Sequence, residues 1–331
     1  MRAVEAKAYG GPEVLSVTES ADPVAGPGEV VIDVAAADVM FLDVRLRGGW
    51  GQDFFPLEVP YVPGGAVAGV VSAVGDGVDA SWLGKRVASR TAASGIGGGK
   101  PIGGYAEKAL AKSETLTVVP DGVRLTQAAA LVHDGITALL VADRAAIQPG
   151  ERVLITGAAG GLGTLLIQLS RAAGATVIAA ARGAAKLELA QRLGAQTVID
   201  YSEPDWPEQV RAATDGRGVD AVFDGAGGDI GRAAVSATAV GGRILGYGNA
   251  AGDFADFDAE AAAAQNITIV GLFELTGSEV DWNALHDRAF AEVAAGRLEV
   301  VIGQTFPLHE ASAAHAAIES RSAVGRTLLT V

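Results

Sequence analysis

The glycine-rich turn at residues 152–163, RVLITGAAGGLG, constrains this chain more than any other stretch. It begins with Val153, Leu154 and Ile155, a short apolar run of the kind that is buried on both faces of a parallel sheet, so a strand is predicted there. Small residues end the run, and leucines at helical spacing follow at positions 162, 165, 166 and 169. A helix that starts at such a turn presents its unpaired amides and the positive end of its dipole to a bound phosphate.

The segments after this turn complete a doubly wound sheet. An apolar run at residues 176–181 follows the predicted helix and closes the first βαβ unit. Further strand candidates alternate with helical stretches, at residues 197–201, 219–224, 243–247 and 267–273. With the strand at 152–156 they make six, which predicts an α/β dinucleotide-binding domain around a parallel six-stranded sheet.

The flanking segments have a different texture. Residues 1–120 are predicted to be β-rich, with strand-like runs at 30–34 and 66–74 and no full-length helix before Thr126. Thr126 is the predicted N-cap of an apolar helix with the sequence TQAAALVHDGITALLVADRA. Near the C-terminus we expect an amphipathic helix, a short strand, a second helical stretch and a last strand, with the helices at 280–296 and 310–320 and the last strand at 327–331.

Composition excludes several classes of protein. The 331 residues are enough for two domains, and the absence of cysteine excludes disulfides, thiolate catalysis and cysteine-ligated zinc. A net charge of −14 without a long basic run argues against a nucleic-acid partner. No uninterrupted apolar stretch long enough to cross a bilayer is evident, and the start MRAVEAKAYGG lacks the apolar core of a signal peptide. No membrane partner and a cytoplasmic location are therefore expected.

The sequence resembles the zinc-independent quinone oxidoreductases of the medium-chain dehydrogenase/reductase superfamily over nearly its whole length. The motifs that carry this resemblance are PYVPGGAVAGVVSAVGDGV (60–78), GGYAE (103–107), AAGGLG (158–163), LGAQTVIDY (193–201), VDAVFDGAGG (219–228), GYGNAAG (246–252) and the ending ASAAHAAIESRSAVGRTLLTV. The resemblance implies a GroES-like β-barrel catalytic domain at 1–122, completed by 275–331, and a Rossmann NADP-binding domain at 123–274. It also implies an active site in the cleft and a homodimer or homotetramer.

The chain departs from the family pattern at the positions that hold a metal or a substrate. Zinc-dependent relatives carry histidine and glutamate where this chain has Gly65 and Ala66, and cysteine where it has Met40. No metal site is therefore predicted. Quinone reductases typically carry asparagine at Met40 and tyrosine at Arg45, so both of the usual polar contacts to a substrate carbonyl are absent.

The choice of nicotinamide cofactor depends on the end of the second Rossmann strand, where an NAD-specific protein places a carboxylate. This chain reads AAARGAAK there. Arg182 can grip a 2′-phosphate with two hydrogen bonds, and Lys186 adds a second positive charge. The resemblance assigns Tyr201 to the same phosphate, so NADPH is the predicted cofactor. The alternative is that Arg182 and Lys186 only solvate a helix start.

Further cofactor contacts are predicted where the strands end, because ligands bind beyond the carboxyl ends of strands in such sheets. By resemblance, the loop after the fourth strand lies near the cofactor ribose, and the loop after the fifth strand lies near the nicotinamide, as does Thr137. The alternative is that these loops are simple glycine turns and that Thr137 is a residue of a helix surface. The predicted cofactor-binding residues are Thr137, Ala159, Gly160, Gly161, Leu162, Gly163, Arg182, Lys186, Tyr201, Gly225, Ala226, Tyr247, Gly248 and Asn249.

Hydride transfer to a quinone or an activated alkene produces an oxyanion, which needs a hydrogen-bond donor. The candidates are Arg45, Tyr61 and Tyr105, with Arg45 favoured because it replaces the family tyrosine. Arg45 is equally well interpreted as a solvent-facing side chain or a partner of Asp43. The four histidines are far apart in sequence and are interpreted as structural, although His133 precedes Thr137 and is the one that could approach the cleft.

The function favoured by the sequence is an NADPH-dependent, zinc-independent reductase of quinones, enones or enals. Two alternatives stay open. One is an enoyl or 2-enal reductase of the same superfamily. The other is a protein that binds NADPH as a sensor or scaffold and has lost catalysis, which the replacements at Met40 and Arg45 allow.

Overall fold

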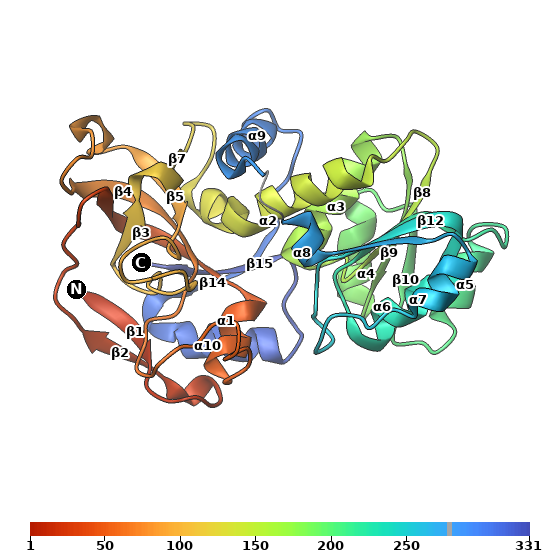
Figure 1. Ribbon diagram of the computed structural model, residues 1–331, viewed down its shortest axis with the longest axis horizontal. Helices are drawn as coiled ribbons and strands as arrows, with labels where there is room; N and C mark the ends of the chain where they lie inside the picture. The colour runs from red at the N-terminus through yellow and green to blue at the C-terminus, as the bar shows by residue number, and fades with distance from the viewer. Residues whose placement is uncertain (277–279) are drawn as a thin grey trace. The chain divides into compact units, whose positions relative to one another are not determined.

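The computed structural model describes residues 1–276 and 280–331 of the chain, which form two compact units (Figure 1). Unit 1 comprises Met1–Gly135 and Trp282–Val331, and unit 2 comprises Ile136–Asp281. The first boundary lies inside the helix α2 (Leu125–Ala145), whereas the sequence prediction placed it at 122/123. The second lies at 281/282 instead of 274/275.

Unit 2 is built on a parallel sheet of six strands, as predicted, in the order β10-β9-β8-β11-β12-β13. Buried β-branched and alanine side chains dominate these strands, which suits a sheet covered on both faces. The strands are β8 (Arg152–Thr156), β9 (Thr176–Ala181), β10 (Thr197–Asp200), β11 (Val219–Asp224), β12 (Thr238–Gly246) and β13 (Thr268–Gly271).

Helices connect the successive strands of unit 2, and a short last helix follows β13. They are α3 (Gly161–Ala172), α4 (Ala184–Arg192), α5 (Trp206–Ala212), α6 (Gly228–Ala234), α7 (Ala259–Ala264) and α8 (Leu272–Leu275), with the 3-10 turn η4 (Val235–Ala237). The chain moves outward from β8 to β10 and then returns to β11 on the other side of β8. The loops after β8 and β11 therefore flank the point where the strand order reverses, which is where open parallel sheets bind ligands.

Unit 1 contains a seven-stranded sheet and a separate antiparallel pair, β1 (Arg2–Ala6) with β2 (Leu15–Glu19). The larger sheet runs β14-β15-β3-β4-β5-β7, with β6 paired to β3. The C-terminal strand β15 hydrogen-bonds to β3, so the two ends of the chain fold together. Its strands are β3 (Glu29–Val39), β4 (Ala66–Val74), β5 (Arg86–Arg90), β6 (Lys108–Lys112), β7 (Thr117–Val118), β14 (Ile302–Pro307) and β15 (Arg326–Thr330).

The helices of unit 1 are short, apart from its share of α2 and a helix of 13 residues near the C-terminus. The helix α1 (Phe41–Arg47) follows β3 directly and was not predicted, since seven residues are too few for a clear helical period. It packs against α10 (Ala311–Glu319), and α9 (Trp282–Ala294) precedes β14 (Figure 1). Short 3-10 turns complete the unit: η1 (Pro12–Val14), η2 (Ala80–Trp82), η3 (Ser113–Thr115) and η5 (Leu308–Glu310).

The helix α2 differs from its prediction at its N-terminus. It begins at Leu125, so Thr126 lies inside it and is not its N-cap; the side chain of Gln127 instead accepts a hydrogen bond of 3.0 Å from the Arg124 amide. By length and composition α2 could also cross a membrane, although Asp134 interrupts its apolar run. Because 61% of its most apolar window is buried inside the protein, this is also the pattern of a core helix.

Candidate functional site

The glycine turn between β8 and α3 has the geometry of a phosphate cradle. Gly160 is the N-cap of α3, and the amides of its first turn have no acceptor within the helix. Gly157 has a φ of +63°, which favours glycine. A Cβ atom on Gly163 would lie 2.6 Å from the Gly157 carbonyl oxygen, so the helix packs against the turn only because position 163 is glycine. The predicted residues 159–163 all lie on this turn.

The cationic residues predicted to select the cofactor lie next to one another. Arg182 follows the end of β9 and is exposed, and Lys186 is in the first turn of α4. Tyr201 follows β10, and its amide donates a hydrogen bond of 3.3 Å to the carbonyl of Ala181. Because β9 and β10 are parallel neighbours, the three side chains start from one edge of the sheet.

The sequence analysis overlooked Asp200 at this edge. Its carboxylate accepts hydrogen bonds from the Gly183 amide at 2.9 Å and from the Ser202 hydroxyl at 2.5 Å. Partial burial opposes its ionisation, but these hydrogen bonds and the charge of Arg182 lower the pKa of Asp200. Asp200 therefore remains an anion that fixes the turn before α4. Its position in the motif LGAQTVIDY is the sequence feature from which it could have been predicted.

The loops after β11 and β12 interlock around a buried carboxylate. Asp224, 1% exposed, accepts hydrogen bonds from the hydroxyl of Thr156 at 2.5 Å and from the amides of Ala226 and Gly227, each at 3.1 Å. Its main-chain carbonyl accepts from the amides of residues 247 and 248, at 3.0 and 3.1 Å. A Cβ atom on Gly248 would lie 2.2 Å from the carbonyl oxygen of Gly225. The structure thus brings together the predicted residues 225, 226 and 247–249.

Thr137, the remaining predicted cofactor residue, lies on α2 in the part that belongs to unit 2, and is half-buried. Its role near a nicotinamide stays a prediction.

In unit 1 a chain of polar side chains runs through the interior behind α1. The hydroxyl of Tyr105 lies 3.2 Å from Asp43 Oδ2 and 3.0 Å from His315 Nε2. On the other side of the imidazole, Nδ1 lies 3.4 Å from a guanidinium nitrogen of Arg47, which also pairs with Glu319. Since Arg47 only donates, His315 accepts at Nδ1, carries its proton on Nε2 and donates to Tyr105, which donates to Asp43.

Burial sets the charge states along this chain. It lowers the pKa of His315 to about 3, with a further contribution from Arg47, so the imidazole is neutral. Burial also raises the pKa of Asp43 to about 7, although the Met40 amide donates a hydrogen bond of 2.8 Å to its carboxylate. The pKa of Tyr105 is raised as well, by burial and then by Asp43. Tyr105 is 0% exposed, which suits a positioning residue better than the oxyanion donor that was predicted.

Tyr61, the second predicted donor, pairs its main chain with Ala6, and its side chain is 7% exposed. Its hydroxyl has no hydrogen-bond partner among the described residues. Burial, followed by the nearby charge of Asp43, raises its pKa. A buried hydroxyl without a partner is costly unless a water or a ligand satisfies it, so Tyr61 keeps its place among the candidate donors.

The positions where zinc-dependent relatives hold their metal do not fit a zinc ion here. A Cβ atom on Gly65 would lie 2.9 Å from the Met40 methyl group and 3.4 Å from His133 Cε1. Gly65 therefore offers no ligand, and its neighbours here are a thioether and one imidazole ring. Within residues 1–276 and 280–331, no group of three or more metal-binding side chains occurs. The Asp38 carboxylate lies 4.0 Å from His133 Nδ1, and it is bound to the Arg326 guanidinium.

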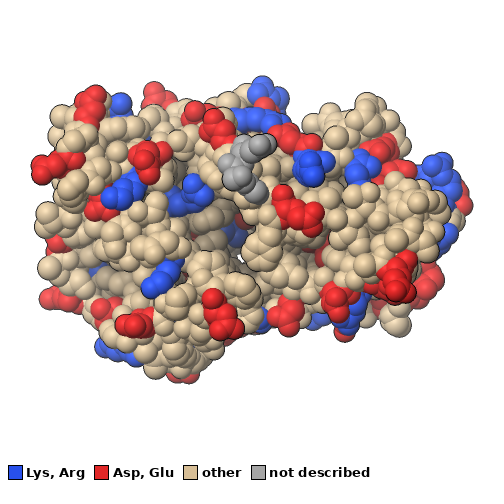
Figure 2. Space-filling view, viewed as in Figure 1, with Lys and Arg blue, Asp and Glu red and all other residues tan. Residues whose placement is uncertain are grey.

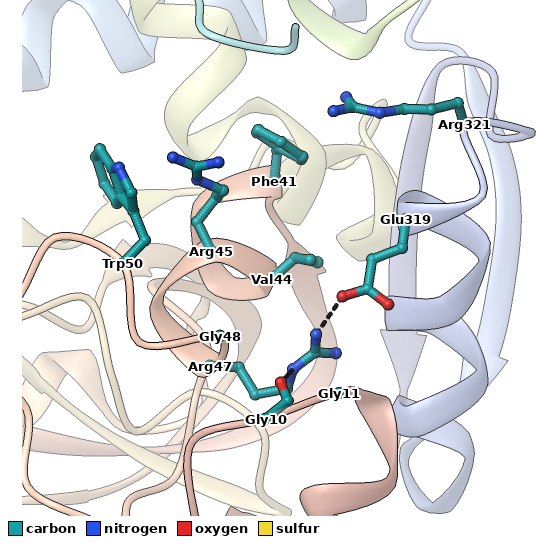
Figure 3. A pocket seen from close by; sticks show the side chains of 10 residues that line it. All are labelled: Gly10, Gly11, Phe41, Val44, Arg45, Arg47, Gly48, Trp50, Glu319 and Arg321. Carbon is teal, nitrogen blue, oxygen red and sulfur yellow. Dashed lines mark hydrogen bonds and ion pairs between the residues drawn. The ribbon is translucent and has the colours of Figure 1, made fainter. Parts of the chain in front are cut away.

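Arg45, the favoured oxyanion donor, lines a pocket of about 380 Å³ on unit 1 (Figure 3). The pocket lies along α1, between the turn at residues 10–11 and the segment that ends α10. Besides glycines and Arg47, its walls are Phe41, Val44, Arg45, Trp50, Glu319 and Arg321. The Arg45 guanidinium lies over the ring of Trp50, 4.9 Å from its centroid. Arg321 was not predicted as a site residue.

Two family models match the chain: the alcohol dehydrogenase GroES-like domain over residues 26–121 and the zinc-binding dehydrogenase over residues 161–291. A probable quinone oxidoreductase of Schizosaccharomyces pombe is 33% identical over 330 residues, covering 98% of this chain and 96% of the relative. A 2-haloacrylate reductase of Burkholderia is 33% identical over 332 residues, covering 97% and 96%. The structure of Escherichia coli quinone oxidoreductase complexed with NADPH is similar with a TM-score of 0.89 at 27% identity, covering 100% of both chains.

Proposed function

The chain belongs to the quinone oxidoreductase family of the medium-chain dehydrogenase/reductase superfamily, and from this premise we propose that it transfers a hydride from NADPH to a quinone or a similar activated carbonyl compound. The observation that carries the proposal is the glycine cradle of unit 2 together with the cations Arg182 and Lys186 at the neighbouring strand end. The cradle suits a pyrophosphate, and the cations suit a 2′-phosphate.

The residues of unit 2 divide the work of holding the cofactor. The amides of residues 161–163 bind the pyrophosphate, and Arg182, Lys186 and Tyr201 bind the adenosine phosphate. The interlocked loops after β11 and β12 provide a rigid backbone for the ribose and the nicotinamide, with Thr137 nearby. The bound cofactor supplies the hydride, and these residues orient it and keep water away.

On the acceptor side, the proposal assigns the pocket along α1 to the substrate. The rings of Phe41 and Trp50 offer flat apolar walls, and Arg45 donates a hydrogen bond to the acceptor as negative charge develops on its oxygen. Tyr61, whose hydroxyl has no partner among the described residues, is the alternative donor but is not among the residues that line this pocket. Zinc takes no part, because Met40 and Gly65 offer neither thiolate nor imidazole ligands.

A second candidate activity is the reduction of an activated alkene, which the similarity to a 2-haloacrylate reductase favours. The same parts serve both reactions, because hydride addition to the β-carbon of a conjugated carbonyl also places negative charge on an oxygen. The acceptor therefore has to be found by experiment.

The finer proposals concern location and assembly. A cytoplasmic homodimer or homotetramer is proposed from the family resemblance, with no nucleic-acid or membrane partner. On the face shown in Figure 2, acidic and basic side chains are interspersed, which supports a small-molecule substrate over a polyanion.

The test is NADPH oxidation by the purified protein with menadione, hexenal, cyclohexenone and crotonyl thioester, in parallel with NADH and after exhaustive chelation. Turnover that prefers NADPH and survives chelation supports the proposal. Tight NADPH binding without turnover of any acceptor would favour the sensor alternative. Turnover that requires added zinc would overturn the assignment.

A further inference from the structure

We infer that the pocket along α1 binds the carboxylate of an anionic conjugated acceptor, so that this chain prefers charged acceptors over their neutral esters. The inference rests on the proposed function and names the acceptor class for that site. Three features of unit 1 support it: the charges that line the pocket, the rings that hold those charges and the backbone that presents one of them.

The lining of the pocket has an excess of positive charge. Three arginines and one glutamate line it, and Glu319 is bound to the buried Arg47, as the dashed line in Figure 3 marks. Arg47 also donates a hydrogen bond of 3.0 Å to the Gly10 carbonyl, so its guanidinium is bound to groups of the protein. Arg45 and Arg321 are therefore the ionic groups of the lining that can meet a ligand, and both are cations.

Aromatic rings hold both guanidinium groups in place. The Arg45 group lies 4.9 Å from the centroid of the Trp50 ring, and the Arg321 group lies 4.6 Å from that of Phe41 (Figure 3). Stacking fixes the plane of a guanidinium and leaves its N–H edges for hydrogen bonds. Both arginines have further contacts in the chain, and five N–H donors on each leave capacity for a bound anion.

The backbone conformation of Arg321 is one that usually favours glycine, which supports a functional role for its side chain. Arg321 follows the end of α10 with a φ of +59°, a left-handed conformation at a helix end where glycine is the usual residue. For a residue with a Cβ atom this conformation carries a steric cost, because the Cβ atom approaches a backbone carbonyl oxygen. Glycine would remove that cost but would also remove the guanidinium from the pocket wall.

The ligand chemistry follows from this arrangement. Guanidinium groups match the planar geometry of a carboxylate, and the two rings beside them accept a flat conjugated skeleton. Arg45 stands where quinone reductases typically carry an uncharged tyrosine, so the change adds a formal charge to the acceptor site. A conjugated acid or a quinone that bears a carboxylate meets both requirements.

The experiment compares matched acceptors that differ only in charge. Naphthoquinone carboxylate and its methyl ester form one pair, and chloroacrylate and methyl chloroacrylate form the other. Arg45→Met and Arg321→Met are measured beside Arg297→Met, which removes an exposed arginine paired with Glu292 elsewhere in unit 1. Because the ratio of kcat/KM for acid and ester is compared between variants, the intrinsic reactivity of each acceptor cancels.

We expect each pocket variant to lower the acid-to-ester ratio by about tenfold or more, mostly through KM, while Arg297→Met leaves it unchanged. Added salt should lower kcat/KM for the acid with the parent protein and have less effect on it with Arg45→Met. Arg45→Lys should retain part of the preference for the acid over the ester. Circular dichroism and thermal melting report that each variant is folded, because Arg45→Met also removes the proposed oxyanion donor and so lowers turnover of both acid and ester.

Two results would overturn the inference while leaving the proposed function intact. One is an acid-to-ester ratio that neither variant changes. The other is a higher KM for NADPH with every acceptor, which would assign the two guanidiniums to the phosphates of the cofactor. If the parent protein oxidises NADPH with neither member of either pair nor with menadione, the proposed function itself fails.

Discussion

Arg182 and Lys186 are cations at a strand end where an NAD-specific protein carries a carboxylate, and Tyr201, which the resemblance assigns to the same phosphate, follows the neighbouring strand β10. We predict that Arg182→Met weakens NADPH binding by about ten- to a hundredfold, the usual cost of losing a charge-assisted hydrogen bond, and leaves NADH binding nearly unchanged. Isothermal titration with both cofactors measures this. Arg217→Met, at an exposed site in unit 2, is the matched control, and equal losses for both cofactors would contradict the prediction.

A second prediction for a single residue concerns Asp43, because burial raises its pKa to about 7 in the folded protein. A folded-state pKa above the unfolded value means that this carboxyl favours folding below about pH 4 and loses that contribution as the pH rises through about 7. Asp43→Asn removes the dependence. The variant should therefore gain roughly 2–4 kcal/mol of unfolding free energy relative to the parent between pH 5 and pH 8.5.

Urea unfolding at the two pH values measures this difference. The difference between the two proteins is used because both contain His133 and His315, whose pKa values are lowered to about 3. These neutral imidazoles make the stability of each protein rise with pH, which is opposite to the effect of Asp43, and their contribution cancels in the difference. A difference that stays constant with pH would mean that Asp43 is ionised throughout.

Sequence reasoning at the scale of residues has most to work with where the residues of a site are close in the chain. The glycines of the cradle and the cations after β9 lie within one βαβ unit, so their spacing alone suggests a cofactor site. The Arg47–His315 contact joins residues separated by 268 positions, and nothing in either local sequence indicates the other. Asp43 was considered as a partner of Arg45, but in the fold its carboxylate turns inward to Met40 and Tyr105.

Among elements, the turn into α3 yields a prediction with an internal control. Gly163→Ala places a methyl group 2.6 Å from the Gly157 carbonyl oxygen, whereas Gly160→Ala meets the same oxygen at 3.4 Å. The backbone cannot yield at 163 without displacing the turn, so Gly163→Ala should abolish measurable NADPH binding and lower the melting temperature. Gly160→Ala should melt within a few degrees of the parent. Fluorescence titration and thermal melting check both, and equal effects would contradict the geometry.

The six Rossmann strands were predictable because each is a short apolar run bounded by turn residues. Boundaries were less accurate: the last apolar run, predicted as strand through Phe273, leaves the sheet after Gly271 and enters α8. An apolar stretch of that length is compatible with either element, and contacts with the rest of the fold decide between them. The helix α1 escaped prediction for a related reason, since its seven residues span barely two turns.

For the whole molecule, the two compact units have other boundaries than the domains that the resemblance implies, which stay a prediction. The first lies after Gly135 in the middle of α2, a continuous helix without any change of composition at that point. A domain boundary inside a helix leaves no linker to detect, because the same apolar periodicity serves the core of both units. Each unit nevertheless has a hydrophobic core of its own, around Tyr105 in unit 1 and Trp206 in unit 2.

Separate cores lead to a last prediction, on unfolding. Calorimetry should resolve two transitions, and NADPH should raise the one that belongs to unit 2, because a ligand stabilises the state that binds it. At a hundred times its dissociation constant the stabilisation is about 2.7 kcal/mol, or roughly 5–10 °C for a unit of this size. Trp206 is the one tryptophan of unit 2, so the transition that Trp206→Phe removes from the fluorescence signal identifies it. If NADPH instead moves the transition reported by the other tryptophans, the cofactor is held by unit 1 and the assignment of the cradle is wrong.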